Sequence, residues 1–268
     1  MNRSLLVAVL ALLAGALPVW AQAPASGAAD PDSGSTPPVQ FLSHSAFHLA
    51  AEHLSTDDVR FKWDTNFGGD VDLVDYGHGR LNFLANYQAI LGHEFRAFDP
   101  EQGNYVLEGS LSLRTSGVEA SAVFYHQSRH LSDRPKRFAI DWNSFGGRVE
   151  KTLSHRAYSM DARADLRGVV YKSYVDYNWE LDSNVRNAYR VRPTVSVISD
   201  AGLRLIGVNG TQNRGTQTGV HGEGGVRIEG SGAAVELYVS IERRIDPYPT
   251  EFTTASWFGA GFRLASLR

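Results

Sequence analysis

The sequence predicts an all-β protein, a closed antiparallel transmembrane β-barrel of about twelve strands in the bacterial outer membrane. Three features predict this fold: an export-type N-terminus, segments in which apolar and polar residues alternate, and tight turns that alternate with long polar connections. The 26 basic and 29 acidic residues form no basic stripe, so the composition does not favour a nucleic-acid partner. The absence of cysteine excludes a lipoprotein anchor, a disulfide scaffold and a cysteine-type zinc site.

The N-terminal segment has the order of a secretory signal peptide. A charged start at Met1–Arg3 precedes an apolar run at Leu5–Leu17 and the small residues around Ala21 and Ala23. We therefore expect residues 1–23 to be a cleaved signal peptide, 24–40 a flexible leader rich in Ala, Gly, Ser, Pro and Asp, and 41–268 the barrel. No later apolar run approaches the roughly 20 residues of a membrane-spanning helix.

Alternation of apolar and polar residues defines the candidate strands. It is clearest at Ala233–Glu242, where the odd positions are apolar and the even positions mostly polar. The first two of the twelve candidates are the weakest, so ten strands is the alternative, and His44–Leu54 is open between a short helix and a rim segment. The candidates are Arg60–Phe67, Asp70–Tyr76, Arg80–Ala97, Tyr105–Arg114, Val118–Ser128, Phe138–Leu153, Ala157–Lys172, Val185–Ile198, Leu203–Val208, Gly219–Glu229, Ala233–Glu242 and Ala255–Ala265.

The connections predict the topology. Tight turns are expected at 77–79, 115–117, 154–156, 199–202 and 230–232, because Gly, Ser and Asp suit hairpins. Long connections are expected at 98–104, 129–137, 173–184, 209–218 and 243–254. Outer-membrane barrels have short periplasmic turns and longer external loops. We expect the barrel assembly machinery as a partner, although the chain runs on past its aromatic last strand to 266–268.

One hairpin carries a candidate catalytic constellation. His126 and Ser128 are two residues apart on a predicted strand and share a face. Symmetric closure of the hairpin pairs His126 with Asp141 and Ser128 with Ala139, which gathers a hydroxyl, a base and a carboxylate for nucleophilic hydrolysis. A slip of one residue would move Asp141 to the other face. The small alanines beside His126 favour the lumen, and the lipid-facing side is the alternative.

Two other interpretations of this segment compete with catalysis. A polar ladder of this kind is common inside barrels. Binding through His126, His130 and Asp133 is the other alternative. No metal site is expected, because histidines two apart along a strand lie too far apart to share one ion, and no cofactor is expected.

The same segment resembles two families. It is similar to an uncharacterised family of bacterial outer-membrane barrels with a Tyr-His-x-Ser-x-His-Leu-x-Asp segment, matched by Tyr125, His126, Ser128, His130, Leu131 and Asp133. Ser132 and Arg134 stand where that family has a glycine and an acid. The His-x-Ser element also resembles that of the outer-membrane lipid A deacylases, whose catalytic Ser and His face the outer leaflet. Here Arg129 replaces the Asn after the serine, and Asp141 would serve for the family's Glu.

Three functions therefore compete. The first is a structural or interaction barrel, or a narrow channel. The second is an acyl hydrolase of outer-leaflet lipid, with lipopolysaccharide as partner, Ser128 as nucleophile, His126 as base and Asp141 as orienting acid. The third is a soluble exported β-protein.

Overall fold

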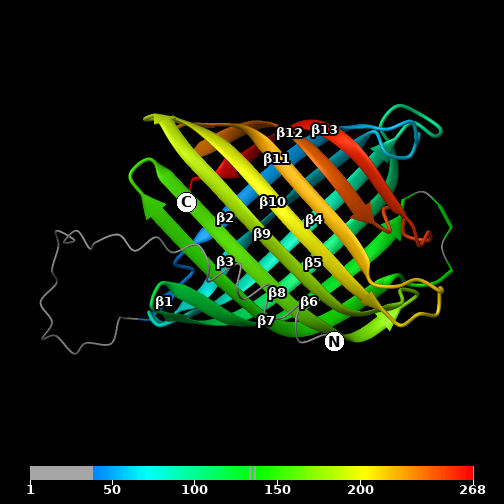
Figure 1. Ribbon diagram of the computed structural model, residues 1–268, viewed down its shortest axis with the longest axis horizontal. Helices are drawn as coiled ribbons and strands as arrows, with labels where there is room; N and C mark the ends of the chain where they lie inside the picture. The colour runs from blue at the N-terminus through cyan, green and yellow to red at the C-terminus, as the bar shows by residue number, and fades with distance from the viewer. Residues whose placement is uncertain (1–38, 133, 136, 268) are drawn as a thin grey trace, which may run out of the picture. The chain divides into compact units, whose positions relative to one another are not determined.

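The protein is a closed antiparallel β-barrel (Figure 1). The computed structural model describes residues 39–132, 134, 135 and 137–267, so the predicted signal peptide and most of the predicted leader lie outside the described residues. Strands β2 to β13 pair in chain order, and β13 pairs with β2 to close the wall, for example through Phe262 and Ala51. The predicted fold class is confirmed.

The wall strands are long enough to cross the apolar part of a membrane at a tilt. A short strand, β1 (Gln40–Phe41), pairs with the end of β3. No helix in the described part of the chain is long and apolar enough to cross a membrane. The wall consists of β2 (Ser45–Ser55), β3 (Trp63–Asp75), β4 (Arg80–Gly92), β5 (Asp99–Thr115), β6 (Val118–Leu131), β7 (Asp141–His155), β8 (Tyr158–Ser173), β9 (Tyr177–Arg192), β10 (Val195–Val208), β11 (Gln217–Glu229), β12 (Ala233–Ile245) and β13 (Thr254–Ser266).

The first strands differ from the prediction. The segment left open at His44–Leu54 is strand β2, and the candidates Arg60–Phe67 and Asp70–Tyr76 are one strand, β3. Two features of β3 obscured it: glycines at 68 and 69, and a register shift between Asp72 and Val74 that interrupts the alternation. The predicted number of about twelve wall strands is confirmed, although Arg60–Phe67 and Asp70–Tyr76 count as one strand and His44–Leu54 supplies another.

The predicted turn at 199–202 is also wrong. Those residues lie inside β10, and the hairpin turn falls between Arg192 and Val195. Asp200 and Gly202 belong to the lumenal row of β10, where Asp200 accepts a hydrogen bond of 2.6 Å from Asn184. A polar lumen accepts Ser, Asp and Gly within a strand. The composition of residues 199–202 therefore predicts a turn where the chain forms part of β10. The predicted long connection at 173–184 shortens to 174–176 for the same reason, because β9 begins at Tyr177.

Short and long connections lie at opposite ends of the barrel, as predicted for an outer-membrane topology. The predicted turns at 77–79, 115–117, 154–156 and 230–232 are confirmed. Ser116 and Gly117 both have positive φ, as a two-residue hairpin turn requires. The long connections gather at the right in Figure 1, and the C-terminus lies at the opposite end.

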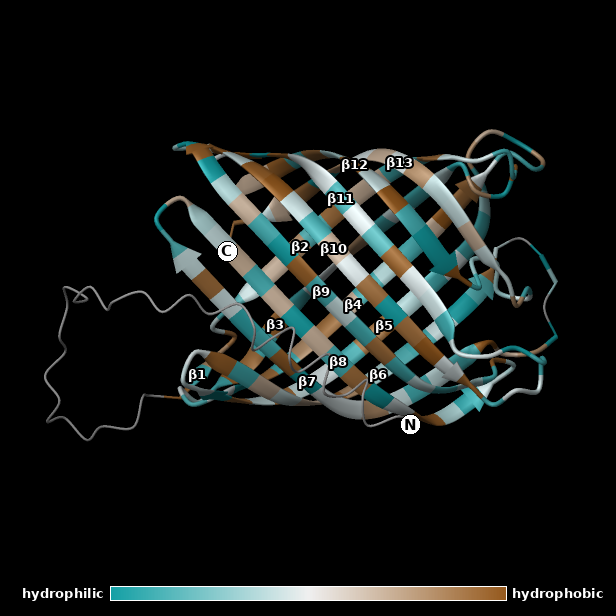
Figure 2. Ribbon diagram, viewed as in Figure 1, coloured by the Kyte–Doolittle hydropathy of each residue, from teal (hydrophilic) through white to brown (hydrophobic). Residues whose placement is uncertain are grey.

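Polar and apolar residues alternate along the wall strands (Figure 2), so the two faces of the wall differ in polarity. On β12, Leu237 and Val239 are more than half exposed on the outside, whereas Glu236 is fully buried in the lumen. The outside is therefore a lipid-compatible belt. Ion pairs fill the lumen: Arg148 contacts Glu108 at 2.6 Å and Asp165 at 2.8 Å.

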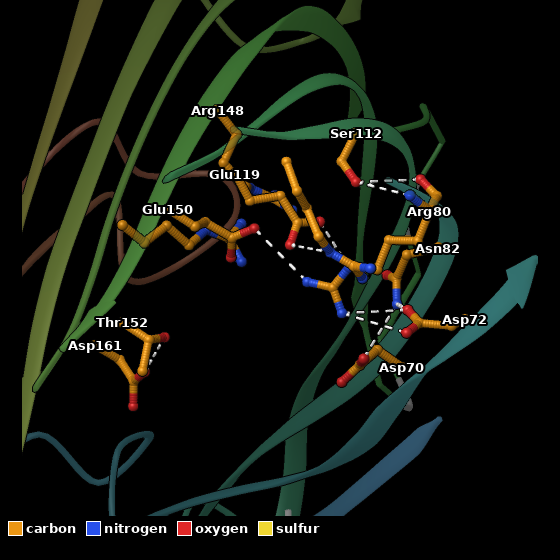
Figure 3. A network of polar contacts seen from close by, with 12 residues as sticks. Asp70, Asp72, Arg80, Asn82, Ser112, Glu119, Arg148, Glu150, Thr152 and Asp161 are labelled. Carbon is orange, nitrogen blue, oxygen red and sulfur yellow. Dashed lines mark hydrogen bonds and ion pairs between the residues drawn. The ribbon is translucent and has the colours of Figure 1, made fainter. Parts of the chain in front are cut away.

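A second lumenal network lies towards the short-turn end (Figure 3). The Arg80 guanidinium bridges Asp72 at 3.2 Å and Glu119 at 2.7 Å, and Asn82 donates to Asp72 at 2.9 Å. Arg80, Asn82 and Glu119 line a cavity of about 960 Å³. Because acids and bases are matched within it, the network braces the wall from inside.

Candidate functional site

His126 and Ser128 face outward, which corrects the expectation that they line the lumen. On β6 the lumenal positions are Ser121, Val123, Tyr125 and Arg129, all buried, and Phe124 is exposed on the opposite face. His126 and Ser128 alternate with the lumenal residues and so share the outer face with Phe124. The small alanines of this strand face the surroundings of the barrel rather than its interior.

The register of the β6–β7 hairpin differs from the prediction by two residues. Ser128 pairs with Asp141, and His126 pairs with Asn143. The predicted partners, Asp141 for His126 and Ala139 for Ser128, are wrong because β6 continues to Leu131 and β7 begins only at Asp141, so the connection lies further along the chain than symmetric closure assumes. A shift of two residues preserves the face, so Asp141 still shares the outer face with both residues.

Asn143 holds His126. The Nδ1 atom of His126 lies 2.6 Å from the Oδ1 atom of Asn143. An amide oxygen only accepts, so Nδ1 carries the proton and Nε2 is left as the basic nitrogen. Sequence reasoning missed Asn143, although its position two residues after Asp141 on the same strand was a usable signal.

Ser128 lies between two histidines of its own strand. Its Oγ atom is 2.8 Å from Nε2 of His130. The ring of His130 in turn makes an edge contact with Tyr105, whose centroid is 5.3 Å away. Since neighbours two apart on a strand flank the same position, the Ser128 hydroxyl has His130 on one side and His126 on the other.

Asp141 does not join this hydrogen-bonded set. Asp141 sits across from Ser128, but its Oδ1 atom is buried and has no hydrogen-bond partner. Asp133 lies outside the described residues, so its predicted binding role with His130 stays a prediction. Within the described residues, no group of three or more His, Cys, Asp or Glu could hold a metal ion.

The surroundings of the site are apolar on the side towards the middle of the barrel. His126 and Asn143 are flanked by Leu107 of β5 and Tyr171 of β8. The next outward-facing pair along the two strands, towards the middle of the barrel, is Phe124 with Phe145, and both side chains are about half exposed. Polar groups on a lipid-facing surface are energetically costly. The polar cluster of His126, Ser128 and Asn143 borders directly on this phenylalanine pair, which places it at the boundary of the apolar belt near the long-loop end.

The β12–β13 connection closes the lumen at that end. Asp246, Pro247 and Tyr248 are buried. Arg129 donates to the carbonyl oxygens of Asp246 at 2.7 Å and Pro247 at 2.8 Å, and Arg214 contacts the Asp246 carboxylate at 2.7 Å. Conduction through the barrel would require this connection to move.

Comparisons with known proteins identify the fold. No known protein family and no curated protein matches the sequence. The structure is similar to an outer membrane phospholipase from Salmonella typhi, a dimer with bound calcium (TM-score 0.52, 10% identity, 88% of this chain and 94% of that one). It is similar to an active-site mutant of the Escherichia coli phospholipase, in which an asparagine is replaced by alanine (0.51, 10%, 88% and 94%). An outer membrane channel from Pseudomonas putida F1 is comparable (0.50, 11%, 89% and 99%).

These likenesses concern the fold, because the identities are low. Together with the closed wall and its apolar outer belt, they place the chain in the bacterial outer membrane. The hypothesis of a soluble exported β-protein is therefore wrong.

Proposed function

We propose that the protein is a serine hydrolase that cleaves acyl ester bonds of lipids in the outer leaflet. The observation that carries this proposal is the outward-facing row in which Asn143 fixes the His126 ring beside Ser128. A nucleophile, a base and a group that orients the base are the parts that covalent ester hydrolysis needs. Asn143 takes the orienting role that the sequence assigned to Asp141.

The reaction follows from these groups. The Ser128 Oγ atom attacks the ester carbonyl carbon while Nε2 of His126 accepts the hydroxyl proton. The bond from that carbon to the lipid alcohol breaks, the alcohol takes the proton from His126, and the acyl group stays on Ser128. Water then adds its hydroxyl to the acyl carbon and returns a proton through His126 to Ser128, which releases the fatty acid.

His130 holds the hydroxyl before substrate arrives. The serine side chain reaches either neighbour by turning about χ1 between staggered rotamers. We assign the base to His126 because its tautomer is fixed by Asn143, and catalytic hydrogen bonds often tighten only when substrate is bound. The outward direction of the site gives access to lipid without passage through the lumen.

The location of the site supports a lipid substrate. Acyl chains would lie along the apolar outer face formed by Phe124 and Phe145, with the ester at the level of Ser128. The two phospholipases compared above share this barrel fold. The mutant structure from Escherichia coli is described as an active-site mutant in which an asparagine is replaced, so an asparagine belongs to the active site of that enzyme. A glycerophospholipid and lipid A share the acyl ester that this chemistry requires.

The test is hydrolysis by the full-length protein in detergent micelles that contain a phospholipid or lipid A, followed by mass spectrometry of the released fatty acid. We expect Ser128→Ala to lose roughly 10³-fold or more. His126→Ala should lose about 10²- to 10⁴-fold, and Asn143→Ala about 10²-fold through misorientation.

Two controls make the assignment specific. Ser121→Ala, a lumenal serine of the same strand, should retain full activity. His130→Ala should lose less than about tenfold, because the base is His126. Equal release of fatty acid by wild type and Ser128→Ala, with both correctly folded, would disprove the hydrolase.

A further inference from the structure

Ser128 has four nearest neighbours on the outer face of the wall. His126 and His130 flank it along β6. Tyr105 of β5 and Asp141 of β7 are its partners in the two adjacent strands. The proposed reaction assigns one of these directions, because His126 gives its proton to the leaving alcohol. The released part of the lipid therefore lies on the His126 side, and the acyl chain must extend in one of the three other directions.

Two of the three other directions are polar. On the β7 side, Asp141 is followed by Ser173 of β8 in the same row of strand partners. An acyl chain laid over these groups would shield them from water without supplying a hydrogen bond. Along β6, His130 leads towards the long connection that follows this strand and away from the apolar belt. The β5 side is therefore the direction left for the acyl chain.

The β5 side begins a continuous row of aromatic rings. Tyr105 pairs with Tyr87 of β4, and Tyr87 pairs with Phe67 of β3. The ring centroids are 4.7 Å apart in the first pair and 5.3 Å apart in the second. Tyr105 and Phe67 are about half exposed, and Leu49 of β2 continues the row as the partner of Phe67. This aromatic row of Tyr105, Tyr87 and Phe67 thus starts directly beside Ser128.

The polar tip of Tyr87 does not interrupt the aromatic row. A Cβ atom at Gly103 would lie 2.6 Å from the Tyr87 hydroxyl oxygen, so that hydroxyl lies over Gly103. Gly103 comes two residues before Tyr105 on β5 and is nearer to the long connection that precedes this strand. The Tyr87 hydroxyl therefore points towards the rim while its ring stays in the row. Tyrosine takes this orientation at membrane boundaries.

The length of the aromatic row fits one acyl chain. Adjacent strands lie about 4.8 Å apart, so the three strand spacings from Ser128 to Phe67 span about 14 Å. One leaflet contributes half of a hydrocarbon core that is about 30 Å thick. Because lipid tails are already in an apolar medium, contact with the rings would orient the chain by packing and would not draw it out of the membrane.

We propose that the acyl chain cleaved at Ser128 lies along the aromatic row, while a chain that stays on the released alcohol lies beside Phe124 and Phe145. This inference rests on the hydrolase proposed above and names its substrate class, esters of long-chain fatty acids. A butyryl chain on Ser128 ends near Tyr105, whereas a palmitoyl chain reaches Phe67. The enzyme therefore favours long acyl chains over short ones.

The kinetic test compares the p-nitrophenyl esters of butyrate and palmitate in the same detergent micelles. Tyr87→Ala removes a ring that only the longer chain reaches. We expect the ratio of kcat/KM for palmitate to kcat/KM for butyrate to fall about three- to tenfold. Phe67→Ala is a second variant of the row and should lower the same ratio. Phe83→Ala is the matched control, because Phe83 is an outward-facing ring of β4 outside the row, and it should keep the wild-type ratio. An unchanged ratio in both row variants would overturn the proposed path.

A labelling test maps the path directly and separates it from the hydrolase. The probe is a long-chain alkyl fluorophosphonate with a diazirine at the end of its chain. The Ser128 Oγ atom displaces fluoride from phosphorus while His126 accepts the hydroxyl proton. After irradiation, peptide mass spectrometry should place the cross-links on β3 and β4. Cross-links on other strands, for example β7 and β8, would overturn the path and leave the hydrolase standing. If Ser128 is not labelled and neither ester is hydrolysed, the hydrolase itself fails and the path fails with it.

Discussion

Arg60 orders the β2–β3 connection through its contacts on two sides. It donates to the Asp58 carboxylate at 2.9 and 3.1 Å and to Glu251 of the β12–β13 connection at 2.6 Å. These hydrogen bonds from Arg60 hold the pKa of Asp58 below its ordinary value. The stabilisation that the ionised Asp58 carboxylate gives to the folded state is fully present above the unfolded-state pKa of about 3.9. It is lost as the pH falls through the lowered folded-state pKa of Asp58.

We therefore predict that acid loosens this connection only below the ordinary aspartate range. NMR titration of the Asp58 carboxyl should give a midpoint below about 3.9 in wild type and near that value in Arg60→Ala. The protection of the amides of residues 56–62 against hydrogen exchange, relative to an unfolded chain at the same pH, should fall over the same pH range. An ordinary midpoint in the wild-type protein would contradict the proposed ordering by Arg60.

The candidate site was partly predictable from single residues. The spacing of His126 and Ser128 places them on one face whatever the register. The position of Asn143 two residues after Asp141 placed it on the right face, but its pairing with His126 depends on the hairpin register, which the sequence alone does not fix. The face itself was misjudged because alanines fit both a crowded lumen and a lipid-facing surface.

At the scale of the strand, one glycine of β10 makes room for an aromatic ring. Gly207 pairs with Trp179 of β9, and a Cβ at Gly207 would overlap the Trp179 indole. By contrast, Gly109 of β5 has open space where a side chain would go. The same residue type therefore has different structural importance in two strands of one wall.

We predict that Gly207→Ala lowers the free energy of unfolding by about 1–3 kcal/mol, because the indole must move. Gly109→Ala, its matched control, should change it by less than about 0.5 kcal/mol. Urea unfolding in lipid vesicles, followed by Trp fluorescence and by heat-modifiable gel migration, measures both. Equal effects of the two substitutions would refute the packing argument.

Strands with unbroken alternation were predictable and interrupted ones were not. β12 alternates along its length, because each residue meets either lipid or the ion-paired lumen. β3 carries paired glycines and a register shift, and β10 carries turn-type residues at lumenal positions. The β3 error arises because the glycines and the register shift interrupt the alternation. The β10 error arises because a polar lumen selects side chains by their partners on neighbouring strands, which the local sequence does not contain.

At the scale of the whole molecule, the barrel is closed at its long-loop end. Arg129 of β6 donates to the carbonyl oxygen of Asp246, and Arg214 of the β10–β11 connection contacts the Asp246 carboxylate. Tyr177 donates to that carboxylate at 2.7 Å. Further down, Arg204 lies between the outer cavity of about 330 Å³ and the larger inner one. Polar side chains therefore line the lumen at two levels, around Asp246 and around Arg204.

We predict little ion conductance for the wild-type protein in planar bilayers. Arg129→Ala combined with Arg214→Ala should release the β12–β13 connection and raise the conductance. Arg192→Ala, which removes an exposed arginine at the β9–β10 turn at the opposite end of the barrel, should leave it unchanged. Heat-modifiable migration verifies that each variant is folded, and a wild-type conductance as large as that of the double variant would disprove the closure.

The pairing of β2 with β13 also constrains biosynthesis. These two strands are hydrogen-bonded neighbours, yet about 200 residues separate them along the chain. While the polypeptide is being made and exported, β2 has no lasting partner on that side, and its backbone donors and acceptors can recruit other chains. We therefore expect the open edge of β2 to need protection from other chains until β13 has been delivered. A chain that stops short of β13 would keep two unpaired strand edges, those of β2 and β12, in place of a closed wall.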